Sequence, residues 1–280
     1  MGQTALLFPG QGSHSDDMAD PWRDHPRLVE GLERLGTDPF ARLDEGTAMQ
    51  QPAIFLVSVC AWEAAVASDA FASDDVVACA GHSLGDFAAL VAGGALAFGD
   101  ALDLVAERGA AMAAAAELAP QGMVAMLGGE EVDVRALADE LGLTVANDNA
   151  PGQLVLAGTE DAVVAALEAK DRVGARAMRL DVQGAFHSPL MQPAADRLVA
   201  ALERTPISAP TTPVWSSGSA APFPADRDAI AAELAANLLR GVRFRELLLA
   251  LRASGVERYE ELGPGRVLSG LVKRTVGRRA

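Results

Sequence analysis

Five residues, Gly81-His82-Ser83-Leu84-Gly85, stand between a short apolar run of the β type and a helical stretch rich in alanine and leucine. A serine in a G-x-S-x-G pattern between a strand and a helix is typical of a sharp turn that exposes a nucleophilic hydroxyl above a sheet. The two glycines permit this turn because they have no Cβ. A tight turn with a capping serine is the alternative, but the strand–turn–helix setting favours Ser83 as a nucleophile.

Short apolar runs alternate with helical patterns over most of the chain. Strands are predicted at residues 4–8, 76–80, 212–217 and 257–262, and helices at 26–35, 51–67, 102–118, 189–202, 226–239 and 244–254, with further helices after Gly85 and Gly265. Strands that alternate with helices favour a parallel sheet covered on both faces. The sequence therefore predicts an α/β protein.

A second pattern interrupts the first between residues 122 and 188. Strand-like segments at 123–127, 143–146, 153–157 and 176–182 enclose helical segments at 132–141 and 160–170. The order β-α-β-β-α-β is that of a ferredoxin-like unit. We therefore expect a large domain made of residues 1–121 and 189–280, with a ferredoxin-like subdomain inserted at 122–188.

Composition excludes several classes of protein. The 280 residues are 50% hydrophobic and carry a net charge of −15, which argues against a general nucleic-acid binder. No uncharged apolar run approaches the ~20 residues that span a bilayer, and the first residues lack the basic stretch of a signal peptide. Cys60 and Cys79 have no metal-binding or redox spacing and are expected to be buried thiols. We expect a cytoplasmic protein that uses neither membrane nor metal.

Basic residues gather near the end of the chain. Residues 240–280 contain ten Lys or Arg against four acids, so this segment carries +6 while the rest of the chain is acidic. A solvated helix face explains this simply. A basic patch that contacts an acidic partner is the alternative.

A serine nucleophile needs a base, and the chain has four histidines, His14, His25, His82 and His187. His187 lies in a loop with glycine, serine and proline after the last strand of the insertion, and it is the only histidine that follows Ser83. Elimination therefore favours His187. Asp171 and Asp181 lie between the two, but neither has an obvious loop setting, so the group that orients the histidine stays open between an acid and a backbone carbonyl.

Three further residues have chemistry suited to a site with a nucleophilic serine. The backbone amides of Leu84, at the start of a helix, and of Gln11, in a glycine-flanked loop, are candidate donors to an oxyanion. Arg108 lies one helix after the turn. If it is buried, its guanidinium would bind both oxygens of a carboxylate.

These residues belong to an ordered set of motifs that resembles the malonyl-CoA:acyl carrier protein transacylases of fatty acid and polyketide synthesis. The matching stretches are Phe8-Pro9-Gly10-Gln11-Gly12-Ser13, Gln51-Pro52-Ala53, Gly81-His82-Ser83-Leu84-Gly85-Asp86, Glu107-Arg108-Gly109, Asn149-Ala150-Pro151-Gly152-Gln153, Gly184-Ala185-Phe186-His187-Ser188-Pro189-Leu190-Met191 and Glu261-Leu262-Gly263-Pro264-Gly265. They run in the family's order from end to end of the chain.

The resemblance implies an α/β-hydrolase-like large domain with the ferredoxin-like insertion. It implies that Ser83 is acylated, that His187 is its base, and that Arg108 binds the malonyl carboxylate, with the Gln11 and Leu84 amides as oxyanion hole. The histidine would be oriented by a main-chain carbonyl near residues 241–243. The chain departs from the family at His14 and at residues 240–244, and at Asp86, where the family usually has glutamate. Phe186 matches the malonyl-selective version of the family.

The activity implied is transfer of a malonyl group from malonyl-CoA to the phosphopantetheine thiol of an acyl carrier protein, by a ping-pong route through a malonyl-serine ester. CoA thioester is then a substrate, no cofactor is required, and we expect a monomer. Three alternatives remain: a serine thioesterase or hydrolase, a transacylase dedicated to a polyketide or malonate-decarboxylase system, and a non-catalytic scaffold that binds carrier protein. If the chain is a transacylase, the basic segment with Arg274, Arg278 and Arg279 contacts the acidic carrier.

Overall fold

A computed structural model describes residues 2–71 and 75–277 of the chain. The strands are β1 (Thr4–Phe8), β2 (Val76–Gly81), β3 (Gln121–Gly128), β4 (Thr144–Ala150), β5 (Gln153–Thr159), β6 (Ala175–Arg179), β7 (Val214–Trp215) and β8 (Arg258–Glu261). The α-helices are α1 (Pro26–Leu35), α2 (Thr47–Ala67), α3 (Gly85–Ala92), α4 (Phe98–Ala116), α5 (Glu131–Glu140), α6 (Glu160–Ala169), α7 (Gln192–Leu202), α8 (Arg227–Ala236), α9 (Phe244–Ala253) and α10 (Val267–Thr275). Short 3-10 helices are η1 (Asp20–Trp22), η2 (Pro39–Glu45), η4 (Lys170–Val173) and η5 (Pro189–Met191).

The first sheet is parallel and has the strand order β7-β2-β1-β8. Alternate residues of β1 enter different apolar clusters: Leu6 and Phe8 pack with residues of α2, α3 and α4, whereas Ala5 and Leu7 pack with residues of α9 and α10. Side chains of successive strand residues point to opposite faces, so both faces of this sheet are buried. The prediction of a parallel sheet covered on both sides is confirmed.

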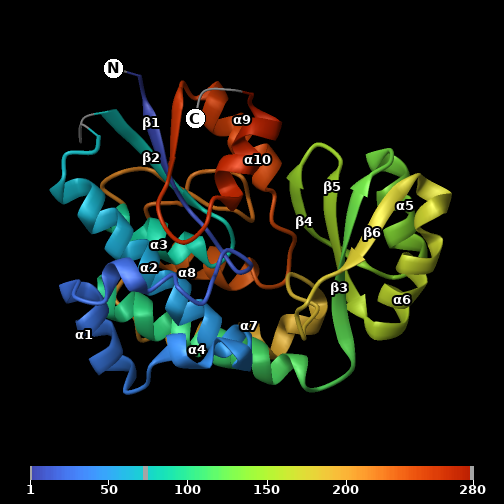
Figure 1. Cartoon of the computed structure of the whole chain (residues 1–280), viewed down its shortest axis with the longest axis horizontal. Helices are drawn as coiled ribbons and strands as arrows, with labels where there is room; N and C mark the ends of the chain where they lie inside the picture. Colours follow the sequence, from blue (N-terminus) through green and yellow to red (C-terminus); the bar gives the residue numbers. More distant parts are fainter. Residues whose placement is uncertain (1, 72–74, 278–280) are drawn as a thin grey trace.

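The second sheet is antiparallel, with the order β4-β5-β3-β6. Val124 and Met126 of β3 pack on α5 and α6, while Met123 and Ala125 turn to the main core beside the parallel sheet. Figure 1 shows this sheet at one side of the molecule with α5 and α6 on its outer face. The βαββαβ order and the strand arrangement confirm the ferredoxin-like pattern, while the division at residues 122 and 188 stays a prediction.

Most predicted elements shift by one or more residues at an end, and for two of them the structure shows a physical reason. Helix α2 begins at Thr47, four residues before the predicted start, and holds Pro52 in its interior. A proline favours the first turn of a helix, yet here burial of the whole apolar middle of α2 outweighs the lost hydrogen bond. Strand β7 covers only Val214–Trp215, because Ser216 and Ser217 leave the sheet for a buried polar network.

Two further features of the described residues concern membrane-spanning helices and the state of the two cysteines. No helix within 2–71 and 75–277 is long and apolar enough to cross a membrane. Cys60 and Cys79 are free and buried, as expected, and burial raises the pKa of each thiol to about 12.

The turn from β2 to α3 lies directly against the end of β1. A Cβ on Gly85 would lie 2.0 Å from the carbonyl oxygen of Phe8, and one on Gly81 would lie 2.0 Å from the amide nitrogen of Asp86. Neither contact is possible for a side chain without moving backbone. These glycines therefore bring α3 onto the carboxyl end of the parallel sheet.

Replacing Gly85 with alanine is expected to lower the free energy of unfolding by about 3 kcal/mol or more, because the new methyl group overpacks against rigid backbone. Gly270, in the exposed part of α10, provides the control, since a Cβ on this residue would have no neighbouring atom within 4 Å. Gly270→Ala should stabilise by about 0.5–1 kcal/mol through reduced freedom of the unfolded chain. Chemical denaturation of both variants tests this, and equal stability of the two would contradict it.

Candidate active site

Ser83 occupies a strained turn between β2 and α3. Its φ of 55° lies in the left-handed region, which costs a residue with a side chain of order 1–3 kcal/mol. The Ser83 amide donates to Ser217 Oγ at 3.1 Å, and its carbonyl accepts from the Asp86 amide at 3.1 Å. Hydrogen bonds on both sides of the residue thus hold the conformation that presents its hydroxyl.

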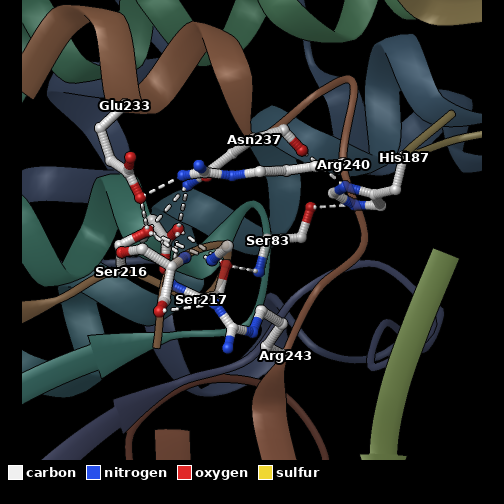
Figure 2. Close-up of polar contacts among 11 residues, drawn as sticks. Ser83, His187, Ser216, Ser217, Glu233, Asn237, Arg240 and Arg243 are labelled. Carbon is white, nitrogen blue, oxygen red and sulfur yellow. Dashed lines mark hydrogen bonds and ion pairs between the residues drawn. The ribbon is translucent and has the colours of Figure 1, made fainter. Parts of the chain in front are cut away.

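His187 meets this hydroxyl from the segment between β6 and η5. His187 Nε2 lies 2.7 Å from Ser83 Oγ, and Nδ1 lies 2.7 Å from the carbonyl oxygen of Asn237 (Figure 2). A carbonyl can only accept, so Nδ1 carries the hydrogen and Nε2 is left to accept from Ser83. This is the tautomer that a general base needs.

The carbonyl that orients His187 is not the one expected. The resemblance pointed to residues 241–243, whereas the contact comes from Asn237, which follows the last residue of α8. The last carbonyls of a helix have no partner within it, and they are therefore available as acceptors. Neither Asp171 nor Asp181 is the partner of Nδ1, so the open choice between acid and carbonyl is decided for the carbonyl.

Arg108 approaches the same hydroxyl from α4. Its side chain is buried at 2% exposure, with Nη2 donating to Ser83 Oγ at 2.8 Å and Nη1 donating to Gln51 Oε1 at 2.5 Å. Its Nε is buried and has no partner in the described part of the chain. Burial lowers the pKa of Arg108 to about 10, and the nearby charge of Asp86 opposes this shift. The guanidinium therefore stays charged at neutral pH and has unused hydrogen-bonding capacity.

Burial also sets the state of the base. The pKa of His187 falls to about 3, first because burial penalises the imidazolium and then because the charge of Arg108 repels it. The hydrogen bond to Asn237 opposes the shift. His187 is therefore neutral, and able to accept a proton, at every physiological pH.

A row of side chains connects Arg108 to the loop after β1. Gln51 accepts from Arg108 and donates to Thr47 Oγ1 at 2.7 Å, and Thr47 donates to Gln11 Oε1 at 3.0 Å. Gln11 in turn donates to Gln50 Oε1 at 2.9 Å. All these bonds run in one direction from a buried cation, an arrangement in which each bond polarises the next. The row fixes the loop that carries the Gln11 amide.

One cavity of about 380 Å³ contains all six residues predicted from the sequence. They are Gln11, Ser83, Leu84, Arg108, Phe186 and His187. The amides of Gln11 and Leu84 make no hydrogen bond within the described residues, so both remain available to an oxygen near Ser83. Met112, Met123 and Phe186 supply an apolar wall.

The other histidines have different settings. His82 Nε2 donates to Asn149 Oδ1 at 2.7 Å, which ties the turn to β4. His25 lies at the start of α1, where Nδ1 accepts from the Arg27 amide. His14 lines the mouth of the cavity. Within residues 2–71 and 75–277, no group of three or more His, Cys, Asp or Glu side chains could hold a metal ion.

Sequence reasoning did not identify Thr47, Ser217 and Asn237. Each contacts the site through a tertiary approach of distant segments, and none stands in a pattern that indicates chemistry. Gln51 could have been identified from the sequence, because it lies in one of the motifs shared with the family.

The parallel sheet, with a serine in a strained turn at its carboxyl end, defines an α/β protein with a candidate serine nucleophile. The chain belongs to the acyl transferase domain family, whose profile matches residues 37–279. This confirms the resemblance drawn from the motifs, and it identifies the chain as an acyltransferase.

Relatives with known names are similar over the full chain. The malonyl CoA-acyl carrier protein transacylase of Bacillus subtilis (strain 168) is 37% identical and covers 100% of this chain and 92% of the relative. That of Escherichia coli (strain K12) is 35% identical, covering 99% of this chain and 94% of the relative.

Solved structures agree with the fold. MCAT from Mycobacterium tuberculosis superposes with a TM-score of 0.91 at 34% identity, covering 98% of this chain and 93% of that chain. A malonyl-transacylase in complex with its type II PKS acyl-carrier protein gives a TM-score of 0.90 at 33% identity, with the same coverage of 98% and 93%. The predicted fold class is confirmed.

Arg108→Gln is expected to raise the pKa of His187, because it removes a positive charge that disfavours the imidazolium. The imidazole then begins to take up a proton at higher pH than in the wild type, where the pKa is about 3. An NMR titration of labelled histidine measures the change. Arg34→Gln, at an exposed ion pair with Asp103, should leave the His187 pKa where it was; an unshifted pKa in Arg108→Gln would contradict the account.

Proposed function

We propose that the chain transfers malonyl groups from malonyl-CoA to the phosphopantetheine thiol of an acyl carrier protein, through a malonyl ester on Ser83. The observation that carries this proposal is the position of Ser83 Oγ, 2.7 Å from a neutral imidazole and 2.8 Å from a buried guanidinium. The first group activates the serine, and the second is a receptor for a carboxylate. The names of the relatives supply the substrate and the partner.

The first half-reaction forms the acyl-enzyme. His187 Nε2 takes the proton from Ser83 Oγ as the oxygen attacks the thioester carbonyl carbon. The amides of Gln11 and Leu84 stabilise the oxyanion, a contribution of about 3–4 kcal/mol per donor when one is removed. The carbon–sulfur bond then breaks, and the imidazolium returns its proton to the CoA thiolate.

The second half-reaction runs in the opposite sense. The carrier's thiol gives its proton to His187, and its sulfur attacks the ester carbon of malonyl-Ser83. Ser83 Oγ leaves with the proton from His187, and malonyl carrier protein is released. The proposed reaction consumes no cofactor, since malonyl-CoA and the carrier's thiol are its substrates and free CoA is a product.

Arg108 provides selectivity for substrates with a free carboxylate. It is buried and charged, and its Nε has no hydrogen-bond partner among the described residues. A malonyl carboxylate would supply the missing acceptor. An acetyl group would leave this buried cation without a carboxylate partner, which disfavours acetyl transfer. Phe186 lines the same cavity, and we expect it to favour unbranched malonyl, as the resemblance implies.

A second cavity, of about 330 Å³, offers a path for the pantetheine arm. It shares Gln11 and His82 with the first and continues between the antiparallel sheet and α10, with apolar walls from Leu127, Val155 and Leu271. Arg274 stands at its rim, where Nη2 donates to the carbonyl of Pro151 at 3.1 Å. The carrier would therefore approach over α10.

The basic segment contributes fewer free charges than its composition suggests. Four of its arginines form ion pairs with carboxylates: Arg240, Arg243, Arg245 and Arg258. Among the described residues, Arg252, Arg266, Lys273 and Arg274 have no such partner, while Arg278 and Arg279 fall outside the described residues. Arg252 lies at the end of α9 and donates to the carbonyl of Val276. The other three, Arg266, Lys273 and Arg274, lie at the start of α10 or within it. These three free cations are the proposed contact for an acidic carrier. A cytoplasmic location and a monomeric state stay predictions.

Two alternatives differ in measurable ways. A thioesterase would release the acyl group to water, and its histidine would commonly be oriented by an acid, whereas His187 contacts a carbonyl. A non-catalytic scaffold would form no ester. A transacylase dedicated to polyketide synthesis or to malonate decarboxylation uses the same chemistry and differs only in its carrier.

Intact-protein mass spectrometry tests the proposal after brief mixing with malonyl-CoA, acetyl-CoA or methylmalonyl-CoA. We expect a malonyl adduct on the wild type and none on Ser83→Ala, with the adduct persisting until a carrier protein is added. Arg108→Gln should lose most malonyl adduct and its preference over acetyl. An adduct that water removes within seconds would favour the hydrolase, and no adduct at all would favour the scaffold.

Arg274→Glu is expected to raise the KM for carrier protein several-fold at low salt, and less at high salt, because exposed charges are screened. The KM for malonyl-CoA in the acylation half-reaction serves as an internal reference. Arg204→Glu, an exposed change of equal charge just after α7, is the matched control. An equal effect of the two substitutions would contradict docking over α10.

A further inference from the structure

We propose that Asp86 is the positioning residue of this active site, because its carboxylate joins the support of Ser83 to the support of His187. Asp86 touches neither reacting atom. It acts through Ser217 on one side and through Asn237 on the other. The inference rests on the assignment of Ser83 and His187 under Proposed function, and it adds a residue to which no catalytic role has been given above.

Both connections end on one oxygen. Asp86 Oδ2 accepts from Ser217 Oγ at 2.8 Å, from the Ser217 amide at 3.3 Å and from Asn237 Nδ2 at 3.1 Å. Ser217 Oγ is also the acceptor for the Ser83 amide. A continuous path therefore leads from the backbone of the nucleophile, through Ser217, to Asp86.

The other path leads to the base. The carbonyl of Asn237 holds His187 Nδ1, and the side chain of the same asparagine donates to Asp86. The asparagine Oδ1 accepts from Arg240 Nη2 at 2.8 Å, so both ends of its amide are occupied. Asn237 caps α8, with its amide donating to the carbonyl of Glu233 at 3.0 Å, and these side-chain bonds hold the same residue from its other side.

Ser216 and Glu233 complete the network around Asn237. Asn237 Nδ2 also donates to Ser216 Oγ at 3.1 Å, and Ser216 donates to Glu233 at 2.6 Å. Figure 2 shows these side chains on the side of Ser83 away from His187, with Asn237 reaching across toward the histidine. The network thus links the turn at Ser83, the loop after β7 and the end of α8.

Burying a carboxylate at this position costs free energy, because the charged group loses its hydration. This cost argues against a role that only fills space. Asp86 is 1% exposed, and within the described part of the chain no cation contacts it directly and its Oδ1 has no partner. Burial raises its pKa to about 7, opposed by Ser217 and by the charge of Arg108, while Glu233 adds to the rise. An oxygen with several lone pairs is what three converging donors require.

Asp86 could also have a purely structural role, since it lies in the first turn of α3, where a negative charge interacts favourably with the helix dipole. The structural role and the positioning role require different properties of residue 86. The helix dipole needs the charge alone, whereas positioning needs an acceptor at Oδ2. Asn can place its amide oxygen there without charge, and Leu can do neither.

The test measures the rate at which a fluorophosphonate probe labels Ser83 in the full chain. This probe reports an activated serine without malonyl-CoA or carrier protein, so a chain that labels normally but fails to transfer malonyl would contradict the proposed function and not this inference. We expect Asp86→Leu to slow labelling ~10- to 100-fold through misplacement of the reacting groups. Asp86→Asn should restore most of the rate.

Three further variants make the result specific. Ser217→Ala removes the path to Ser83 and one donor to Asp86, while the Ser217 amide and Asn237 still donate to the carboxylate, and it should slow labelling. Adding it to Asp86→Leu should cause little further loss, because the two act in series. If Asp86→Leu does not fold, Ser217→Ala still tests the path to Ser83. Asp148→Leu removes a half-buried carboxylate that pairs with Arg135 and Arg245 elsewhere, and it should label at the wild-type rate.

Labelling at the wild-type rate in folded Asp86→Leu or in Ser217→Ala would overturn the proposal. Equal losses in Asp86→Asn and Asp86→Leu would also overturn it, because the charge rather than the acceptor would then matter. Losses that add in the double variant would show that the two residues act independently, which the proposal excludes. A wild type that the probe does not label would remove the assignment of Ser83 and the inference with it.

Discussion

The buried charge of Arg108 is the constraint on which the rest of the site depends. A guanidinium at 2% exposure must be surrounded by acceptors, and the structure provides the hydroxyl of Ser83, the amide of Gln51 and the nearby charge of Asp86. The same charge helps to keep His187 neutral. The proposed selectivity for a carboxylate and the proposed activation of Ser83 therefore both involve one cation.

The fold explains how such a site is held. Ser83 and His187 both have positive φ values, 55° and 59°, and neither conformation is favourable for a residue with a side chain. Helices α3, α4 and α8 and the loop after β7 meet at the carboxyl end of the parallel sheet, and their hydrogen bonds retain both conformations. This edge is where ligands bind in open parallel sheets. The antiparallel sheet closes the cavity from the other side with Met123.

Much of this arrangement could be predicted from the sequence, because local patterns encode it. The order of strand-like and helical segments between residues 122 and 188 and the short apolar runs at β1 and β2 indicated the two sheets, and the bounds of α1 and β1 agree with those predicted. All six predicted site residues line one cavity. The motifs that carry them consist of glycines needed for close approach and of side chains needed for chemistry, and both leave a visible mark in a sequence.

Local pattern determined the elements, the nucleophile turn and the identity of the reactive groups, since each depends on residues near one another in the chain. Tertiary structure alone decided which carbonyl orients His187, how Thr47 and Gln51 link Arg108 to Gln11, and how Asp86 meets Ser217 and Asn237. Those contacts include pairs that lie 36 and 151 positions apart in the chain. A backbone carbonyl belongs to every residue, so no sequence pattern distinguishes Asn237 from Val242; only the place where α8 ends does.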